Sequence, residues 1–177
     1  LVKKILILNT GGTISMSEDH TTGKVSPTEN NPIGIGEGIF SHIAYIHMEN
    51  LCNLPSPHIT EYEMFKLKQR IMQAIEEGYE GVVVTHGTDT LEETAYYLEL
   101  TLDVNIPIVI TGAMRSSNEI GADGLANLRS SLVVAVSDES RDKGVLVVMN
   151  DEAHTATYVT KTHTTNVATF QTPTFGP

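Results

Sequence analysis

Short apolar runs recur along the chain, and their alternation with helical patterns is the feature that most constrains the fold. Five runs are rich in isoleucine and valine and have the length of strands. Near-continuous apolar runs of this kind are typical of strands buried on both faces of a parallel sheet. We expect strands at residues 3–10, 43–51, 81–86, 106–112 and 144–150.

Helical patterns fall between these runs. Thr60 and Glu63 match a capping box, which predicts a helix that starts there and stops at Gly78. Apolar residues repeat at helical spacing over 91–102, and a third helix is expected over about 122–136. Strand, helix, strand in this order favours parallel pairing through crossover connections. The sequence therefore predicts an α/β fold, with a doubly wound, mostly parallel sheet and helices on both faces.

Two segments lack these patterns. Residues 15–38 are polar and rich in glycine, proline and asparagine, which predicts a long mobile loop or a lid. The end of the chain, residues 151–177, is rich in threonine, and we expect a β-hairpin there over 156–165.

The composition disfavours several classes of partner. The 177 residues suit one domain, and the formal net charge of -11 argues against nucleic acid and anionic membranes. No segment has the roughly 20 consecutive apolar residues that span a bilayer. Cys52 is the only cysteine, and the histidines form no H-E-x-x-H motif. We therefore expect no disulfide and no metal site, and a reducing compartment such as the cytoplasm.

Polar residues directly follow four of the expected strands. The carboxyl ends of parallel strands share one edge of a sheet, and open α/β sheets bind their ligands beyond that edge. Each cluster alone has a simpler interpretation, because Thr-Gly-Gly-Thr is also a turn sequence and Thr88 or Asp89 would also serve as a helix N-cap. Neither a P-loop nor a dinucleotide-binding glycine motif follows any strand. The clusters are residues 10–13, 85–90, 111–113 and 150–151.

The side chains expected at this edge suggest nucleophilic chemistry. A threonine hydroxyl hardly ionises at neutral pH and needs a base beside it. A lysine becomes such a base only where burial lowers its pKa. Lys161 lies in a threonine-rich stretch and is a candidate, although a lone lysine is more often solvated. His86 is a second candidate base, and a structural role is its alternative.

Five blocks of the sequence resemble bacterial L-asparaginases. "TGGTI" at 10–14 and "THGTDT" at 85–90 match the two signature blocks of that family. Further matches lie at 112–128, 144–151 and 159–170, in the same order along the chain. The resemblance covers nearly the whole sequence, so it is more specific than any single motif.

This resemblance implies hydrolysis of the side-chain amide of L-asparagine to L-aspartate and ammonia, through a threonine nucleophile and an acyl-enzyme. L-Glutamine is a secondary candidate substrate, and the family uses no metal and no cofactor. The residues matched as catalytic are Thr13, as the nucleophile, with Thr88, Asp89 and Lys161; those matched as substrate-binding are Ser56, Asp89, Gly12, Gly87 and Ala113.

Three departures from the family pattern bear on these roles. The family has a tyrosine in the lid, whereas here His20 lies nearest to that position. Pro57 stands where the family usually has a glutamine or glutamate beside the substrate amine, so recognition of the amine would rest on Asp89. The chain resembles only the N-terminal catalytic domain, assigned to 1–177, and a smaller C-terminal domain is expected to be missing from it. Relatives are homo-oligomers, either dimers or tetramers, in which the C-terminal domain of a neighbouring subunit completes each site. We therefore expect the isolated N-terminal domain to be inactive.

Two other functions stay open. Similar domains release ammonia from glutamine within amidotransferases, although no partner module is visible in this sequence. The missing lid tyrosine and Pro57 would also fit a non-catalytic amino-acid-binding domain or an inactive fragment.

Overall fold

The computed structural model describes residues 2–18, 21–22, 25–27, 34 and 38–177. Its centre is a six-stranded sheet in the order β4-β1-β5-β6-β7-β8. The first five of these strands pair in parallel, whereas β8 runs antiparallel to β7. The expected mostly parallel sheet is confirmed, and each predicted run contains one of its parallel strands. In chain order the strands are β1 (Lys4–Asn9), β4 (Tyr45–Asn50), β5 (Gly81–Thr85), β6 (Ile108–Thr111), β7 (Val145–Met149) and β8 (Glu152–Thr155).

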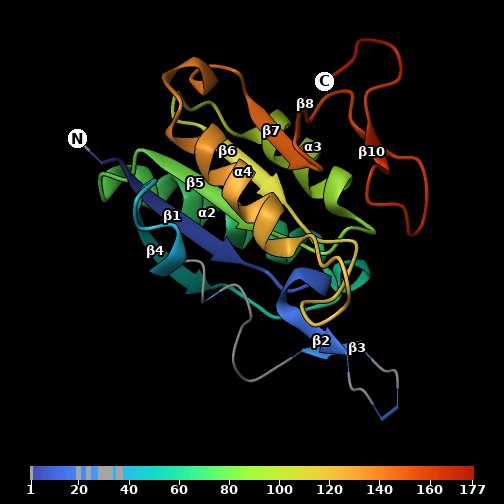
Figure 1. Ribbon diagram of the computed structural model, residues 1–177. Helices are drawn as coiled ribbons and strands as arrows, with labels where there is room; N and C mark the ends of the chain where they lie inside the picture. The colour runs from blue at the N-terminus through green and yellow to red at the C-terminus, as the bar shows by residue number, and fades with distance from the viewer. Residues whose placement is uncertain (1, 19–20, 23–24, 28–33, 35–37) are drawn as a thin grey trace.

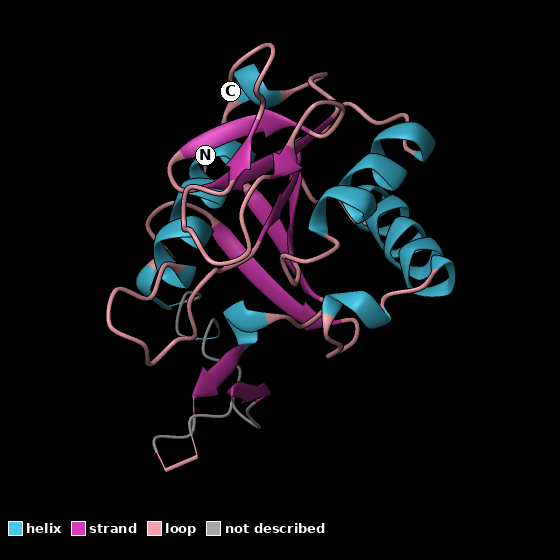
Figure 2. Cartoon of the chain, turned by 90° about the vertical axis from the view of Figure 1, so that its right-hand side faces the viewer, coloured by secondary structure: helices cyan, strands magenta, loops and turns pink. Residues whose placement is uncertain are grey.

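Helices cover both faces of this sheet, as predicted. Helices α2 (Glu61–Glu76) and α3 (Leu91–Thr101) pack on one face, and α4 (Gly124–Val136) packs on the other. Figure 1 shows α4 in front of the strands with α2 and α3 behind them, and Figure 2 shows the same layers from the side.

The two layers of core follow from the alternation of side chains along each strand. Leu6 and Leu8 of β1 are fully buried in the core that includes α2 and α3. Ile5 and Ile7 are fully buried in the core that includes α4. Burial of each such side chain contributes about 1.5–3 kcal/mol. The strands are therefore held from both sides, which fixes the positions of the loops at their carboxyl ends.

The start of α2 confirms the predicted capping box. The N–H of Thr60 donates to Glu63 Oε2 at 2.9 Å, and Thr60 Oγ1 accepts from the N–H of Tyr62 at 3.3 Å. Gly78, just past the helix, has a φ of 79°, which glycine adopts without strain.

The start of α3 corrects one interpretation. Its N-cap is Thr90, so neither Thr88 nor Asp89 caps the helix. The helix begins at Leu91, so Thr88 and Asp89 both lie before its first turn. The side chains of these two residues contact Lys161 instead.

The segment after β7 begins at the polar edge, as expected, because β7 is parallel to β6, and it then reverses the chain. Asn150 and Asp151 have φ values of 53° and 61°, and β8 follows them directly. A two-residue turn with positive φ at both positions suits a β-hairpin, and Asn and Asp tolerate that conformation better than most residues. Asn150 and Asp151 therefore follow the carboxyl end of β7 and turn the chain back into β8, and neither is among the residues that line the cavity described below.

The threonine-rich end does form a β-hairpin, but not over 156–165. Strand β9 (Thr160–Lys161) pairs antiparallel with β10 (Phe170–Gln171), so the loop between them runs beyond the predicted end. The two strands form a separate small sheet beside α3 (Figure 1).

The segment expected to be a long mobile loop or a lid begins with regular structure. A 3₁₀ helix, η1 (Thr13–Ser15), leads into β2 (Met16–Glu18), which pairs antiparallel with β3 (Val25–Pro27). The N–H of Ser117 donates to the carbonyl of Met16 at 3.2 Å, which ties β2 to the loop after β6. Within the described ranges, none of the helices combines the length and apolar character needed to cross a bilayer.

Candidate active site

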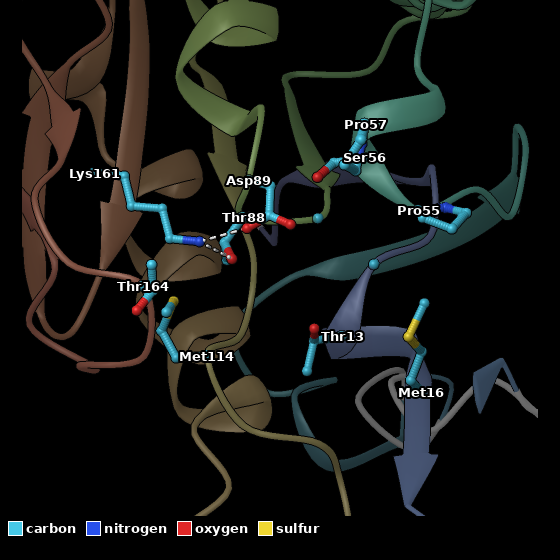
Figure 3. A pocket seen from close by; sticks show the side chains of 12 residues that line it. Thr13, Met16, Pro55, Ser56, Pro57, Thr88, Asp89, Met114, Lys161 and Thr164 are labelled. Carbon is cyan, nitrogen blue, oxygen red and sulfur yellow. Dashed lines mark hydrogen bonds and ion pairs between the residues drawn. The ribbon is translucent and has the colours of Figure 1, made fainter. Parts of the chain in front are cut away.

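The sheet order creates a crevice at the carboxyl ends of β1 and β5. From the carboxyl end of β1 the chain crosses to β4 on one side, and from the carboxyl end of β5 it crosses to β6 on the other side, so the two connections diverge there. Ligands of open α/β sheets bind at such a point. A cavity of about 290 Å³ lies there and is lined by residues from five separate segments. Among them are Thr13, Ser56, Pro57, Thr88, Asp89 and Lys161 (Figure 3).

Two glycines bring the first segment into the cavity. Gly11 and Gly12 have φ values of 109° and 85°, a region that other residues rarely adopt. A Cβ atom on Gly12 would lie 2.3 Å from the Cα atom of Gly87, so the two backbones pack in direct contact. This contact places Thr13 beside the loop that carries Thr88.

Asn9, the last residue of β1, holds the turn at Gly11 and Gly12 by hydrogen bonds from its side chain. Its Oδ1 atom accepts hydrogen bonds from the N–H of Gly11 at 3.2 Å, from Ser15 Oγ at 2.7 Å and from Thr85 Oγ1 at 2.9 Å. The side chain is buried, so these bonds form away from competing water. Asn9 therefore links the end of β1, the helix that begins at Thr13, and the end of β5. Sequence reasoning missed this residue; the signal was a single amide that directly follows the four apolar residues of β1.

Lys161, in β9, connects that strand to the loop after β5. Its Nζ atom lies 3.0 Å from Thr88 Oγ1 and 2.8 Å from Asp89 Oδ1. The Lys161 side chain is only 13% exposed, whereas that of Asp89 is 68% exposed. Lys161 is thus not the solvated lysine of the alternative interpretation, and it donates to a hydroxyl and a carboxylate at once (Figure 3).

Ser56 lines the cavity and is hydrogen-bonded to Thr90 at the start of α3. It begins a short 3₁₀ helix, its side chain is buried, and its Oγ accepts from the N–H of Thr90 at 3.3 Å. Thr90 Oγ1 in turn donates to the carbonyl of Ser56 at 2.8 Å. Gly87 packs on the same residue, because a Cβ there would lie 2.7 Å from Ser56 Cβ. The positions of Ser56 and of the 86–90 loop are therefore coupled.

The loop after β6 reaches the cavity through Met114, and not through Ala113 as predicted. Ala113 is buried in the core that includes α4, whereas Met114 lines the cavity. The carboxylate of Asp123 accepts the N–H of Met114 at 3.0 Å, and Asn127 Nδ2 donates to the carbonyl of Gly112 at 3.0 Å. Asp123 and Asn127 both stand within the block at 112–128 that resembles asparaginases, so residues of that block hold this loop in place.

His86 has a structural environment. The ring is fully buried, and burial lowers the pKa of the imidazole because it penalises the charged form. The Nδ1–H group donates to the carbonyl of Gly87 at 2.7 Å, and Nε2 accepts from Thr94 Oγ1 at 2.8 Å. Both nitrogens of a neutral ring are used in this way, which favours the structural alternative over the role of a base.

Two further expectations concern the rim. Pro57 lines the cavity, where its side chain offers no hydrogen-bond acceptor. His20 lies outside the described residues. Among the residues that the structure describes, no group of three or more His, Cys, Asp and Glu side chains lies close enough to hold a metal ion.

The residues that line this cavity, at the carboxyl ends of β1 and β5, include most of those that the sequence resemblance pointed to, and a comparison with protein families gives the same result. A family model described as "Asparaginase, N-terminal" covers residues 4–177. The chain belongs to the asparaginase family. L-asparaginase 2 of Bacillus subtilis (strain 168) is 42% identical over 180 residues, which cover 97% of this chain and 47% of that protein. L-asparaginase 2 of Escherichia coli (strain K12) is 41% identical over 179 residues, with 98% and 50% covered.

The fold of this asparaginase-family chain is also that of a solved relative. The crystal structure of a probable cytoplasmic L-asparaginase from Campylobacter jejuni superposes with a TM-score of 0.91 at 39% identity. The match covers 98% of this chain and 54% of that one. The chain thus spans about half the length of the asparaginases it matches.

Proposed function

We propose that the chain is the N-terminal catalytic domain of an L-asparaginase, which hydrolyses the side-chain amide of L-asparagine to L-aspartate and ammonia. The observation that carries the proposal is Lys161, whose Nζ lies 3.0 Å from the Thr88 hydroxyl and 2.8 Å from the Asp89 carboxylate in a cavity also lined by Thr13. A hydroxyl, an amine and a carboxylate in contact are the groups that activate a threonine for acyl transfer. Membership of the asparaginase family supports the same substrate class.

In the proposed first step, Thr13 Oγ attacks the carbonyl carbon of the amide. The C–N bond breaks, ammonia leaves, and the threonine carries a β-aspartyl ester. The proton lost by the Thr13 hydroxyl ends on the departing nitrogen, so the charges balance. Backbone N–H groups at the glycine turns around Gly12 and Gly87, which both line the cavity, are the candidate donors to the oxyanion.

Thr88 and Lys161 are proposed to carry protons in both steps. Lys161 Nζ donates to Thr88 Oγ1, so the hydroxyl proton of Thr88 is available to a third group, such as the departing nitrogen. In the second step a water molecule attacks the ester, its hydroxyl joins the acyl carbon, and its remaining proton returns to Thr13 Oγ. Asp89 keeps the lysine side chain aimed at Thr88.

Recognition of the amino acid is proposed to rest on Ser56 and Asp89, for the α-carboxylate and the α-amino group respectively. The Asp89 side chain is 68% exposed, so part of its carboxylate can receive a substrate amine while Oδ1 stays with Lys161. Pro57 adds no acceptor beside it. Glutamine differs by one methylene, which a pocket discriminates by only about 1–3 kcal/mol, so both amides belong in the assay.

The remaining expectations become part of the same proposal. The full-length protein is proposed to be a cytoplasmic homo-oligomer in which a second domain completes the site, and the isolated 177-residue chain to be inactive. Support for the compartment comes from the single thiol, Cys52, and from the Campylobacter jejuni relative, which is called cytoplasmic. Support for the second domain comes from the length of the relatives.

The test is ammonia release from asparagine by the full-length protein and its variants. Thr13→Ala and Thr88→Ala should each lower the rate by at least ~10³-fold, because each removes a reacting hydroxyl. Thr101→Ala is the matched control: that hydroxyl donates to the Tyr97 carbonyl near the C-terminal end of α3, and its loss should leave the rate unchanged. Unchanged turnover in Thr13→Ala or Thr88→Ala would remove that residue from the mechanism.

The same assay separates the alternative functions. Pro57 in the cavity wall is the observation that favours an amino-acid-binding domain without catalysis. In that case asparagine raises the melting temperature of the full-length protein while no ammonia appears. Ammonia released from glutamine but not from asparagine would instead support the amidotransferase type of domain.

A further inference from the structure

The segment that carries Lys161 has little support from the sheets. Strand β9 consists of Thr160 and Lys161 alone, and its pairing partner β10 is equally short. The pair stands apart from the six-stranded sheet. A lysine amine at the end of four methylene groups follows any shift of its own backbone, so a contact to that backbone from outside the pair helps to set where the amine lies.

Glu92 makes that contact. It lies in the first turn of α3, and its Oε2 atom accepts the backbone N–H of Lys161 at 2.5 Å. Its Oε1 atom lies 3.5 Å from Thr160 Oγ1, so both carboxylate oxygens face the two residues of β9. Hydrogen bonds from an N–H group to a carboxylate are about twice as strong as those between neutral groups.

The position of Glu92 on α3 gives this contact a consequence for the cavity. The helix begins two residues after Asp89, and Thr88 and Asp89 are the groups that Lys161 Nζ reaches. One short stretch, residues 88–92, therefore holds Lys161 at both ends, by its backbone through Glu92 and by its amine through Thr88 and Asp89. We infer that Glu92 is a positioning residue, which sets the reach of Lys161 by binding its backbone N–H. This inference rests on the proposed function of the same cavity.

The neighbouring Glu93 provides a matched control. It has the same side chain, stands in the same first helical turn, and is exposed. Removal of either carboxylate costs the helix the same favourable interaction with its N-terminal dipole. A difference between Glu92 and Glu93 variants therefore reports the contact with β9 and not the helix.

The experiment uses the full-length protein with Glu92→Ala, Glu92→Gln and Glu93→Ala. In Glu92→Ala we expect the amides of Thr160 and Lys161 to exchange hydrogen at least ~10-fold faster, because the local opening of β9 becomes easier. We expect kcat for asparagine to fall by ~10–100-fold with KM changed less than about threefold, because a displacement of about 1 Å slows the chemical step. Glu92→Gln keeps an oxygen that accepts the N–H and should recover most of kcat. Glu93→Ala should match the wild type in exchange and in kcat.

Each contrary result has a distinct meaning. Wild-type exchange in β9 together with wild-type kcat in Glu92→Ala would overturn the inference. Equal loss of kcat in Glu92→Gln and Glu92→Ala would also overturn it, because the charge and not the hydrogen bond would then be required. If the wild-type protein releases no ammonia, the proposed function fails, and the exchange rates alone decide whether Glu92 holds β9.

Discussion

The backbone of Gly12 lies directly against that of Gly87, so that a Cβ atom added to Gly12 would stand 2.3 Å from the Cα atom of Gly87. The Cβ position is fixed by the backbone of residue 12, and the atom that it meets is a backbone atom of Gly87, so a side-chain rotation cannot relieve the clash. We expect Gly12→Ala to push Thr13 away from Thr88 and to lower kcat/KM for asparagine by at least ~10²-fold in the full-length protein. Steady-state ammonia release measures this effect.

Gly38→Ala is the control for that variant. Among the residues that the structure describes, none lies within 4 Å of a Cβ added at Gly38, so the activity and melting temperature of this variant should stay near those of the wild type. Equal activity of the Gly12→Ala and Gly38→Ala variants would show that the contact between the two loops is not needed.

Asp89→Asn should separate activity from stability. The change keeps the shape of the side chain but removes the charge that pairs with Lys161 at 2.8 Å. We expect kcat/KM to fall by at least ~10²-fold, because the lysine loses the group that aims it at Thr88. The Asp89 side chain is 68% exposed, and pairs of that kind contribute only about 0–1 kcal/mol. A shift in melting temperature above about 5 °C would mean that the pair has a structural role instead.

The fold could be predicted from the sequence because its signals are local. The apolar runs at β5 and β7 are buried along their whole length, and the capping box at Thr60 marks the start of α2. The polar edge followed from one rule about the carboxyl ends of parallel strands. The rule also holds at Asn150, because β7 is parallel to β6, but it does not determine which loops line the cavity: Asn150 and Asp151 turn the chain back into the antiparallel β8 and lie outside the lining.

The contacts that assemble the cavity could not be predicted in the same way. Glu92 meets Lys161 across 69 positions of sequence, and Asn9 meets Thr85 across 76. No periodicity links such pairs, because each depends on where β9 or the end of β5 lies after folding. The resemblance to asparaginases pointed to Thr13, Thr88, Asp89 and Lys161, but it offered no signal for the side chains that hold them.

Asn9→Ala should affect stability and activity together. The buried Oδ1 atom accepts three hydrogen bonds, and loss of the acceptor leaves the Gly11 N–H and the Ser15 and Thr85 hydroxyls to find new partners. Each unsatisfied buried group costs about 1–3 kcal/mol, so the free energy of unfolding in urea should fall by at least ~2 kcal/mol. Asn50→Ala removes only an exposed partner of Asn9 Nδ2, and we expect it to cost less than about 1 kcal/mol. Equal costs for the two variants would contradict this account of Asn9.

His86 should make the fold less stable at mildly acid pH. Burial lowers the pKa of the imidazole from its ordinary value of 6.5. The unfolded chain therefore binds a proton below about pH 6.5 while the folded chain does not, so stability is complete above that pH and falls as the pH drops from 6.5 towards the lowered pKa. One such group contributes at most about 1.4 kcal/mol per pH unit. The measurement is the melting temperature between pH 7.5 and 5.

Two variants check the assignment of that pH dependence. In His86→Gln the slope should flatten, whereas His42→Gln, which changes an exposed ring, should leave it as in the wild type. Burial also lowers the pKa of His154, so part of the slope should persist in His86→Gln. A wild-type slope in His86→Gln would show that His86 does not contribute.

The proposed mechanism requires that Thr13 forms a covalent ester within the cavity that it lines together with Thr88, Asp89 and Lys161. The most direct test is the mass of the full-length protein, quenched in acid during turnover of asparagine and then digested to locate the modified residue. We predict a β-aspartyl group on Thr13 and none in the Thr13→Ala variant. An aspartyl group on another side chain, or undiminished ammonia release by Thr13→Ala, would contradict the claim.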